Sequence, residues 1–224
     1  MGDRLTYPKT IGQNLRVVAP LAVAQIACYW LLNHFTLLPS HELPLTWLDR
    51  NMPFWIWTVW GYFALIVLAI VLPLAVRDRG VFRQLTVAYA ISVGTAIACF
   101  AFWPTHYPRS PQPIDSSWHS LAYCWLIEVD TPECCFPSSH IIVPLIACVA
   151  LWQDGRRGGC WWLLPVGVGI CTLTILTTKQ HYTWDLLGGL VVAGVGSVVS
   201  GRVLRSRSPD CAPPSGCGRQ RVLH

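Results

Sequence analysis

The stretch that decides the fold runs from Pro137 to Trp152, PSSHIIVPLIACVALW, in which a short polar island leads directly into an apolar run. A second island, KQHYTWD from Lys179 to Asp185, stands in the same way at the start of the run from Trp184 to Val203. Ionisable groups are rare inside membrane segments, and those present usually have a function. Two islands carrying His, Lys and Asp therefore predict chemistry at a membrane surface.

Outward from these islands, the chain contains six apolar stretches near the length of about 17 to 25 residues that a transmembrane helix needs. They run from Val17 to Leu38, Met52 to Val76, Gln84 to Trp103, Pro137 to Trp152, Cys160 to Thr178 and Trp184 to Val203. Composition agrees, because 53% of residues are hydrophobic and only 12% are charged, about half the charge of a soluble domain. The sequence predicts an all-α bundle of six transmembrane helices.

The cations of the connecting segments are distributed unevenly. If successive connections alternate between the two sides of a membrane, one side receives only three of the 16 Lys and Arg residues, namely Arg50, Arg109 and Lys179. Cytoplasmic loops carry an excess of Lys and Arg. The termini are therefore predicted to be cytoplasmic, in an inner or plasma membrane, with both polar islands on the outer face.

Three segments are expected along the chain. Residues 1–16 form a cytoplasmic N-terminal segment, residues 17–204 the membrane domain, and residues 205–224 a disordered basic cytoplasmic tail. The box Ala22-Val23-Ala24 resembles a signal-peptide cleavage site, but the apolar run continues well past it. An uncleaved first helix is favoured.

The longest connection, Pro104 to Phe136, contains a further pattern. Five apolar residues recur at helical spacing, which predicts an amphipathic helix lying in the membrane interface: Trp118, Leu121, Ala122, Trp125 and Leu126. Its tryptophans are ordinary at such an interface, so a packing role is favoured over the shaping of a lipid entrance.

Three of the ten cysteines lie in this outer connection. A disulfide from Cys124 to either Cys134 or Cys135 would pin the loop in an oxidising compartment, and both pairings stay open. The adjacent pair lacks the spacing of a zinc knuckle, so no metal is expected.

The two islands carry complementary chemistry. His181 and Asp185 are four residues apart, so on a helix extended back through His181 they share a face, where the carboxylate orients the imidazole as a nucleophile. His140 follows Pro137, Ser138 and Ser139 at a predicted helix start, where free backbone N–H groups favour a phosphate.

Two cations complete the predicted site. Arg109 can donate a fork of hydrogen bonds to two phosphate oxygens, and Lys179 lies two residues before His181. A nucleophile, an orienting carboxylate, a second histidine for the leaving group and a cationic cradle together predict a phosphoryl-transfer site that needs no metal or other cofactor.

These residues resemble a known family. Phe136 to His140 is similar to the Pro-Ser-x-His motif, and His181 to Asp185 to the His-x3-Asp motif, of the type 2 phosphatidic acid phosphatase superfamily, which is related to the vanadium haloperoxidases. The first motif of that family ends in Arg-Pro, and here Arg109 is followed by Ser110. The resemblance covers about Trp103 to Gly189 and extends to the six-span layout.

The resemblance implies a role for each residue. His181 would attack phosphorus to form a phosphohistidine, Asp185 would orient it, and His140 would protonate the leaving alkoxide. The phosphate would be held by Ser138, Ser139 and Arg109.

The chain also departs from that family. Thr174 and Ile175 stand where the third motif often begins Ser-Arg, so a phosphate arginine is missing and Lys179 is expected to replace it with a single point charge. The usual lysine of the first motif is not evident. The sequence after His181, with Gly188 and Gly189, is closer to the inositol phosphorylceramide and sphingomyelin synthases, so hydrolysis and transfer both remain open.

Three other classes of function are compatible with parts of this sequence. A transporter would need polar residues within the spans, and a metal-dependent hydrolase would need more ligands, for which Glu128, Asp130 and Glu133 are the candidates. An inactive membrane scaffold is the third alternative. The sequence has no pattern of a basic groove with interleaved aromatic residues, so nucleic acid is not expected as a partner. The oligomeric state is left open.

The remaining histidines are taken as structural, with His106 the strongest exception because it is three residues from Arg109: His34, His41, His106, His119 and His224. The expected partner is a lipid phosphate. Phosphatidic acid, a polyprenyl diphosphate, or a phosphoinositol donor with a ceramide-like acceptor all fit.

Overall fold

The computed structural model describes residues 7–109, 111–155 and 162–206. Within these ranges the chain is nearly all helical, with a 3-10 turn at Ile56–Thr58 and two short parallel strands, β1 (His41–Glu42) and β2 (Thr105–His106). The α-helices are α1 (Tyr7–His34), α2 (Trp47–Asn51), α3 (Val59–Leu74), α4 (Arg79–Phe102), α5 (Trp118–Val129), α6 (Ser139–Gln153), α7 (Leu163–Thr177) and α8 (Thr183–Ser206).

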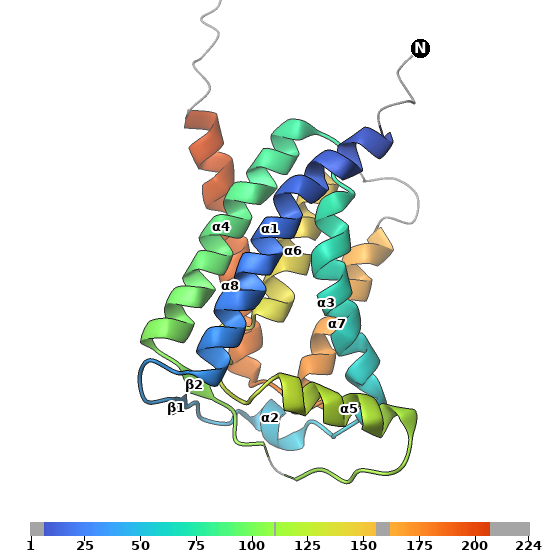
Figure 1. The fold of residues 1–224 in the computed structure, drawn as a ribbon, viewed down its shortest axis with the longest axis vertical. Coiled ribbons are helices and arrows are strands. Elements are labelled where there is room, and N and C mark those ends of the chain that lie inside the picture. Colours follow the sequence, from blue (N-terminus) through green and yellow to red (C-terminus); the bar gives the residue numbers. More distant parts are fainter. Residues whose placement is uncertain (1–6, 110, 156–161, 207–224) are drawn as a thin grey trace, which may run out of the picture.

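Six long helices form a bundle, and the short elements gather at one end of it. Figure 1 shows α1, α3, α4, α6, α7 and α8 along the long axis, with α2, α5 and the two strands together at the lower end. Helix α6 lies inside, packed against α3, α4 and α8. Its side chains Ile141, Ile142 and Ile146 are fully or almost fully buried.

Four helical segments are long and apolar enough to cross a membrane: Ile11–His34, Ile56–Leu74, Arg79–Phe102 and Thr183–Leu204. They indicate a membrane protein. Helices α6 and α7 have only 15 residues each, about 22 Å at 1.5 Å per residue, against a hydrocarbon core of about 30 Å. The predicted count of six spans is therefore not confirmed, and the loop cations Arg156 and Arg157 and the tail from 207 onward lie outside the described residues.

Glycines let α8 approach the segment that carries the first polar island. A Cβ atom added to Gly189 would lie 2.6 Å from Ile141 Cδ1 and 3.0 Å from the carbonyl oxygen of Ser138. A Cβ at Gly188 would overlap the ring of Phe136. The start of α8 is thus pressed against residues 136–141, which brings the two polar islands together.

The predicted amphipathic helix is present as α5, which runs across the lower end of the bundle (Figure 1). Ser117 caps its first turn by accepting a hydrogen bond from the Ser120 amide. Trp118 and Leu121 are exposed, whereas Tyr123 and Leu126 are buried against the bundle.

The predicted disulfide is not formed, because Cys124, Cys134 and Cys135 are free thiols. The loop is held by Asn33 of α1. Its side-chain amide donates to the carbonyl oxygens of Thr131 and Glu133, and its own oxygen accepts from the Thr131 amide.

Candidate active site

The second polar island forms the turn between α7 and α8. Lys179 has a φ of 53°, which reverses the chain after α7. Whether the helix extends back through His181 was open from the sequence, and it does not, because α8 begins at Thr183. His181 nevertheless lies with Nδ1 3.1 Å from Asp185 Oδ2, since the same carboxylate oxygen caps the turn by accepting from the Tyr182 amide.

This pairing is enclosed by protein. The His181 side chain is 4% exposed and that of Asp185 is fully buried. Because a carboxylate only accepts hydrogen bonds, it fixes the proton of His181 on Nδ1. Nε2 keeps its lone pair and is the atom available as a nucleophile.

The start of α8 is supported by α2. The Asp49 carboxylate accepts from both the amide and the hydroxyl of Thr183 at 2.7 Å, and from the amide of Thr46. Burial acts to raise the pKa of Asp49, but these hydrogen bonds outweigh it and the pKa is lowered. A negative charge at a helix N-terminus also stabilises the helix, so α2 holds the turn that carries His181.

The first polar island places His140 in the first turn of α6, with Ser138 as the N-cap. The centroids of the His140 and His181 rings are 5.5 Å apart. The Ser138 amide donates to the carbonyl oxygen of Asp185 at 3.1 Å, which joins the two islands through their backbones. The structure therefore brings the half-buried His140 together with the buried His181 and Asp185 in one site.

Tyr62, which sequence reasoning did not assign to this site, and Asp130, which it named only as a candidate metal ligand, lie behind His140. The Tyr62 hydroxyl of α3 donates to Asp130 Oδ2 at 2.7 Å and lies 3.1 Å from His140 Nε2. Tyr29 of α1 donates to the other oxygen of Asp130. Because the Tyr62 proton goes to the carboxylate, its oxygen can only accept from His140.

The Arg109 side chain contacts the backbone of the same aspartate. Arg109 Nη1 donates to the carbonyl oxygen of Asp130 at 2.7 Å. Asp130 thus connects the predicted phosphate-binding arginine to the histidine predicted to protonate the leaving group. The signal for Tyr62 in the sequence was a tyrosine inside a mostly apolar span, which by itself indicates no role.

Four buried side-chain atoms lack a hydrogen-bond partner in the part of the chain that the structure describes: Arg109 Nε, Ser138 Oγ, Gln180 Oε1 and Asp185 Oδ1. Leaving such a group unpaired costs about 1 to 3 kcal/mol. All four belong to residues around the two histidines. The first two are donors, and a bound phosphate would accept from both.

Lys179 lies differently from the prediction. Its ammonium donates to the carbonyl oxygen of Asp49 at 2.9 Å. Burial lowers the pKa of Lys179, and the charge of Asp49 opposes that shift.

Ile175, at the position where the family often has arginine, is fully buried. Ser139 lines a cavity beside His140.

One group of side chains could hold a metal ion. Cys135, His181 and Asp185 each offer a ligand atom, and these atoms lie within 4.8 Å of one another. Burial raises the pKa of the Cys135 thiol, and the charges of Asp185 and Asp130 raise it further. Since metals bind the thiolate, this thiol would have to lose a tightly held proton first.

Two of the three alternative metal ligands have protein partners of their own. Asp130 is bound by the two tyrosines, while Glu133 accepts from Ser40 and lies 3.0 Å from His106 Nδ1. Glu128 is exposed. His106 therefore has a structural contact with Glu133, outside the pair formed by His140 and His181.

Comparison with known proteins gives one match. The family model described as the PAP2 superfamily matches residues 32–199, a range that includes both histidines, Asp185 and Arg109. No curated protein and no solved structure gives a significant match.

Proposed function

The chain belongs to the PAP2 superfamily, and from that premise we propose that it is a membrane lipid phosphatase that works through a phosphohistidine. The observation that carries this proposal is the buried His181–Asp185 hydrogen bond with His140 across from it. The family supports phosphatase or phosphotransferase chemistry on phosphorylated lipids. The substrate, the intermediate and the membrane face are our proposals.

In the first step, Nε2 of His181 attacks phosphorus, and the bond from phosphorus to the lipid oxygen breaks. His140 gives its proton to the leaving oxygen, and the alcohol departs. Asp185 keeps the Nδ1 proton in place and stabilises the positive charge that forms on the ring.

In the second step, the neutral His140 takes a proton from water as the water oxygen attacks the phosphohistidine. The N–P bond breaks and inorganic phosphate leaves. Arg109 and Ser138 offer their unpaired donors to the phosphate oxygens, whose charge grows in both transition states.

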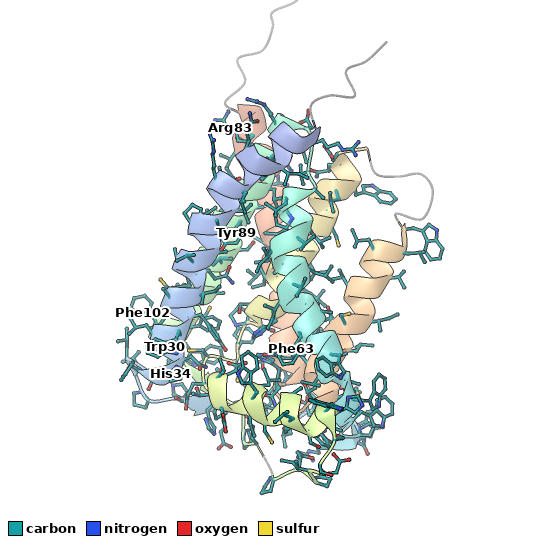
Figure 2. All side chains as sticks on the ribbon, turned by 45° about the vertical axis from the view of Figure 1, so that its right-hand side comes forward. Trp30, His34, Phe63, Arg83, Tyr89 and Phe102 are labelled. Atoms are coloured by element: carbon teal, nitrogen blue, oxygen red, sulfur yellow. The ribbon has the colours of Figure 1, made fainter. Side chains whose placement is uncertain are left out.

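We place this site on the outer face of the membrane, with α6 and α7 completing six spans. The charges support this orientation. The end of the bundle away from α5 carries Arg77, Arg79 and Arg83, and Figure 2 shows Arg83 there. At the other end, Arg109 and Lys179 are both bound to backbone carbonyls.

Cysteine reporters test this orientation in a chain whose native cysteines are replaced. Both reporter positions are exposed: Ser116 before α5 and Gln153 at the end of α6. An impermeant reagent added outside intact cells should label a cysteine at Ser116 and spare one at Gln153. The opposite pattern would place the chemistry on the cytoplasmic face.

Transfer to an alcohol is the second candidate function, and the sequence from His181 to Gly189 favours it. Both reactions share the phosphohistidine and differ in the acceptor. Purified protein should be incubated with labelled lipid phosphates and diphosphates, with and without acceptor alcohols such as ceramide. A phosphatase releases inorganic phosphate in every case, whereas a transferase diverts label to the acceptor.

The same assay addresses the remaining classes. Activity that persists in a chelator would exclude a metal-dependent hydrolase built on Cys135, His181 and Asp185. Absence of turnover with every substrate, from protein that is folded, would favour the inactive scaffold and contradict our proposal.

A further inference from the structure

The Cys135 thiol lies beside the proposed nucleophile but takes no part in the proposed reaction. Its sulfur, one nitrogen of His181 and one carboxylate oxygen of Asp185 lie within 4.8 Å of one another. All three side chains are buried, and only 2% of Cys135 is exposed. Thiolate, imidazole and carboxylate are the three kinds of side-chain ligand that bind Zn²⁺ in proteins.

The fold places Cys135 in this position and turns its neighbour away. The Cys135 amide donates to the carbonyl oxygen of Thr105 in β2 at 3.3 Å, and its side chain packs with Tyr107 and Tyr182. Cys134 has a φ of 57° and packs into a separate cluster, with residues of α1, α4 and α6. The two adjacent thiols therefore lie in different parts of the core, and Cys135 is the one beside His181.

Asp185 has an oxygen that a bound phosphate would leave unsatisfied. Its Oδ2 accepts from the Tyr182 amide and lies 3.1 Å from His181 Nδ1. Its Oδ1 is buried and has no hydrogen-bond partner within the described residues. A phosphate oxygen is itself an anionic acceptor and cannot satisfy another acceptor. A cation can, and it would offset the cost of burying this oxygen unpaired.

The three ligand atoms are close to the spacing that a zinc ion requires. Atoms within 4.8 Å of one another share a central point no more than about 2.8 Å from each, against zinc bonds of about 2.0 to 2.3 Å. Side-chain shifts of less than about 1 Å would close the difference. The charges also match, because the metal removes the proton of a coordinating thiol, and a thiolate with a carboxylate balances Zn²⁺.

We propose that Cys135, His181 and Asp185 form an inhibitory site for Zn²⁺ and other divalent cations that bind thiolates. On binding, the thiol proton passes to solvent, and the ion bonds to the sulfur, to one carboxylate oxygen and to one ring nitrogen of His181. If that nitrogen is Nε2, its lone pair is taken up by the metal. If it is Nδ1, the ring proton moves to Nε2. In both cases Nε2 cannot attack phosphorus.

Inhibition by added metal tests this site, with the neighbouring cysteine as a matched control. Full-length protein in phosphatidylcholine nanodiscs is assayed with hexadecyl phosphate, and each rate is divided by the same protein's rate in chelator. Zn²⁺ and Cd²⁺ should inhibit wild-type and Cys134→Ser protein at similar concentrations. Mg²⁺ at those concentrations should not inhibit, because it prefers oxygen ligands.

Cys135→Ser should need about tenfold more Zn²⁺ or higher for the same inhibition, since even residues that only support a metal ligand change affinity by about 10- to 100-fold. Cys135→Ala gives the same expectation without adding a hydroxyl at a buried position, and thermal unfolding checks that each variant is folded. Equal sensitivity of wild-type protein and a folded Cys135 variant, or equal inhibition by Mg²⁺, would overturn the proposal.

The binding step does not depend on the proposed function, whereas the inhibition rests on it, and a measurement without turnover separates the two. Bonds from Cd²⁺ to thiolates give a charge-transfer absorption band in the ultraviolet. At saturating Cd²⁺ this band should be equal in wild-type and Cys134→Ser protein and smaller by one thiolate per chain in Cys135→Ser. An unchanged band in Cys135→Ser would overturn the proposal. The expected bands from wild-type protein that shows no turnover in chelator would instead contradict the proposed function.

Discussion

Nδ1 of His181 lies 3.1 Å from Asp185 Oδ2, and the same oxygen accepts from the Tyr182 amide. One carboxylate therefore both shapes the turn before α8 and fixes the tautomer of the histidine. This double use explains why the pair can form although His181 precedes the helix. It also means that the proposed nucleophile is set in place before a substrate arrives.

Asp185→Asn should lower kcat by about a thousandfold or more, because the asparagine amide can present a donor to Nδ1 and favour the wrong tautomer. The measurement is phosphate release at saturating substrate. Asp154→Asn is the control, since Asp154 accepts from the Arg77 and Asp78 amides at the other end of the bundle. Near-normal activity of folded Asp185→Asn protein would contradict the orienting role.

Tyr62→Phe should lower kcat about tenfold with little change in KM, because it removes the hydroxyl between Asp130 and His140 while keeping the ring. The pH–rate profile should shift as well, since His140, the proposed acid and base, loses a hydrogen-bond partner. Tyr89→Phe is the matched control, because that hydroxyl bonds to Gln25 away from the histidines. An unchanged pH–rate profile would contradict an effect of the Tyr62 hydroxyl on His140 and leave Tyr62 with a packing role alone.

Substitutions of Arg109 and Lys179 should have different effects, the first on catalysis and the second on the stability of the fold. Arg109→Ala should cost about 2 to 4 kcal/mol of transition-state stabilisation, the scale of losing one charge-stabilising group. Lys179→Ala should leave kcat within a few-fold and lower the free energy of unfolding by about 1 kcal/mol, because its ammonium is hydrogen-bonded to the Asp49 carbonyl. The reverse pattern would show that Lys179 moves to the phosphate when substrate binds.

Gly189→Ala should destabilise the protein by about 1 to 3 kcal/mol, the range for overpacking, because its methyl group would meet Ile141 and the Ser138 carbonyl. Activity should fall too, since His140 lies two residues after Ser138 in the same segment. Gly194→Ala on the same helix is the control, as nothing lies within 4 Å of its added Cβ. It should be neutral or stabilising. Similar unfolding curves for the two variants would contradict the close packing described for α8.

Much of the site could be predicted from the sequence because its motifs are local. The four-residue spacing of His181 and Asp185 and the helix-start residues before His140 can be identified without knowing the tertiary packing. Helix α5 followed from the periodicity of its apolar residues. Tyr62 and Asp130 could not be predicted as partners, because they are 68 positions apart and meet only through the packing of α3 against the segment that follows α5.

The differences between sequence and structure have physical causes as well. Apolar character does not distinguish a helix that faces lipid from one buried in protein, so hydropathy gave six spans without revealing that α6 has only 15 residues and is enclosed by its neighbours. The position of Lys179 next to the motif gave no information on the direction of its side chain, which turns to α2. Cysteine proximity in the sequence likewise did not establish a disulfide.

The central claim is that phosphorus becomes bonded to Nε2 of His181, and trapping that intermediate tests it most directly. Wild-type protein mixed with a ³²P-labelled lipid phosphate and quenched within one turnover should carry acid-labile, alkali-stable label that mass spectrometry assigns to His181. His140→Ala should still accept the label from a substrate with a good leaving group and release it slowly. Turnover by wild-type protein with no label on His181, or full turnover by His181→Ala, would contradict the account.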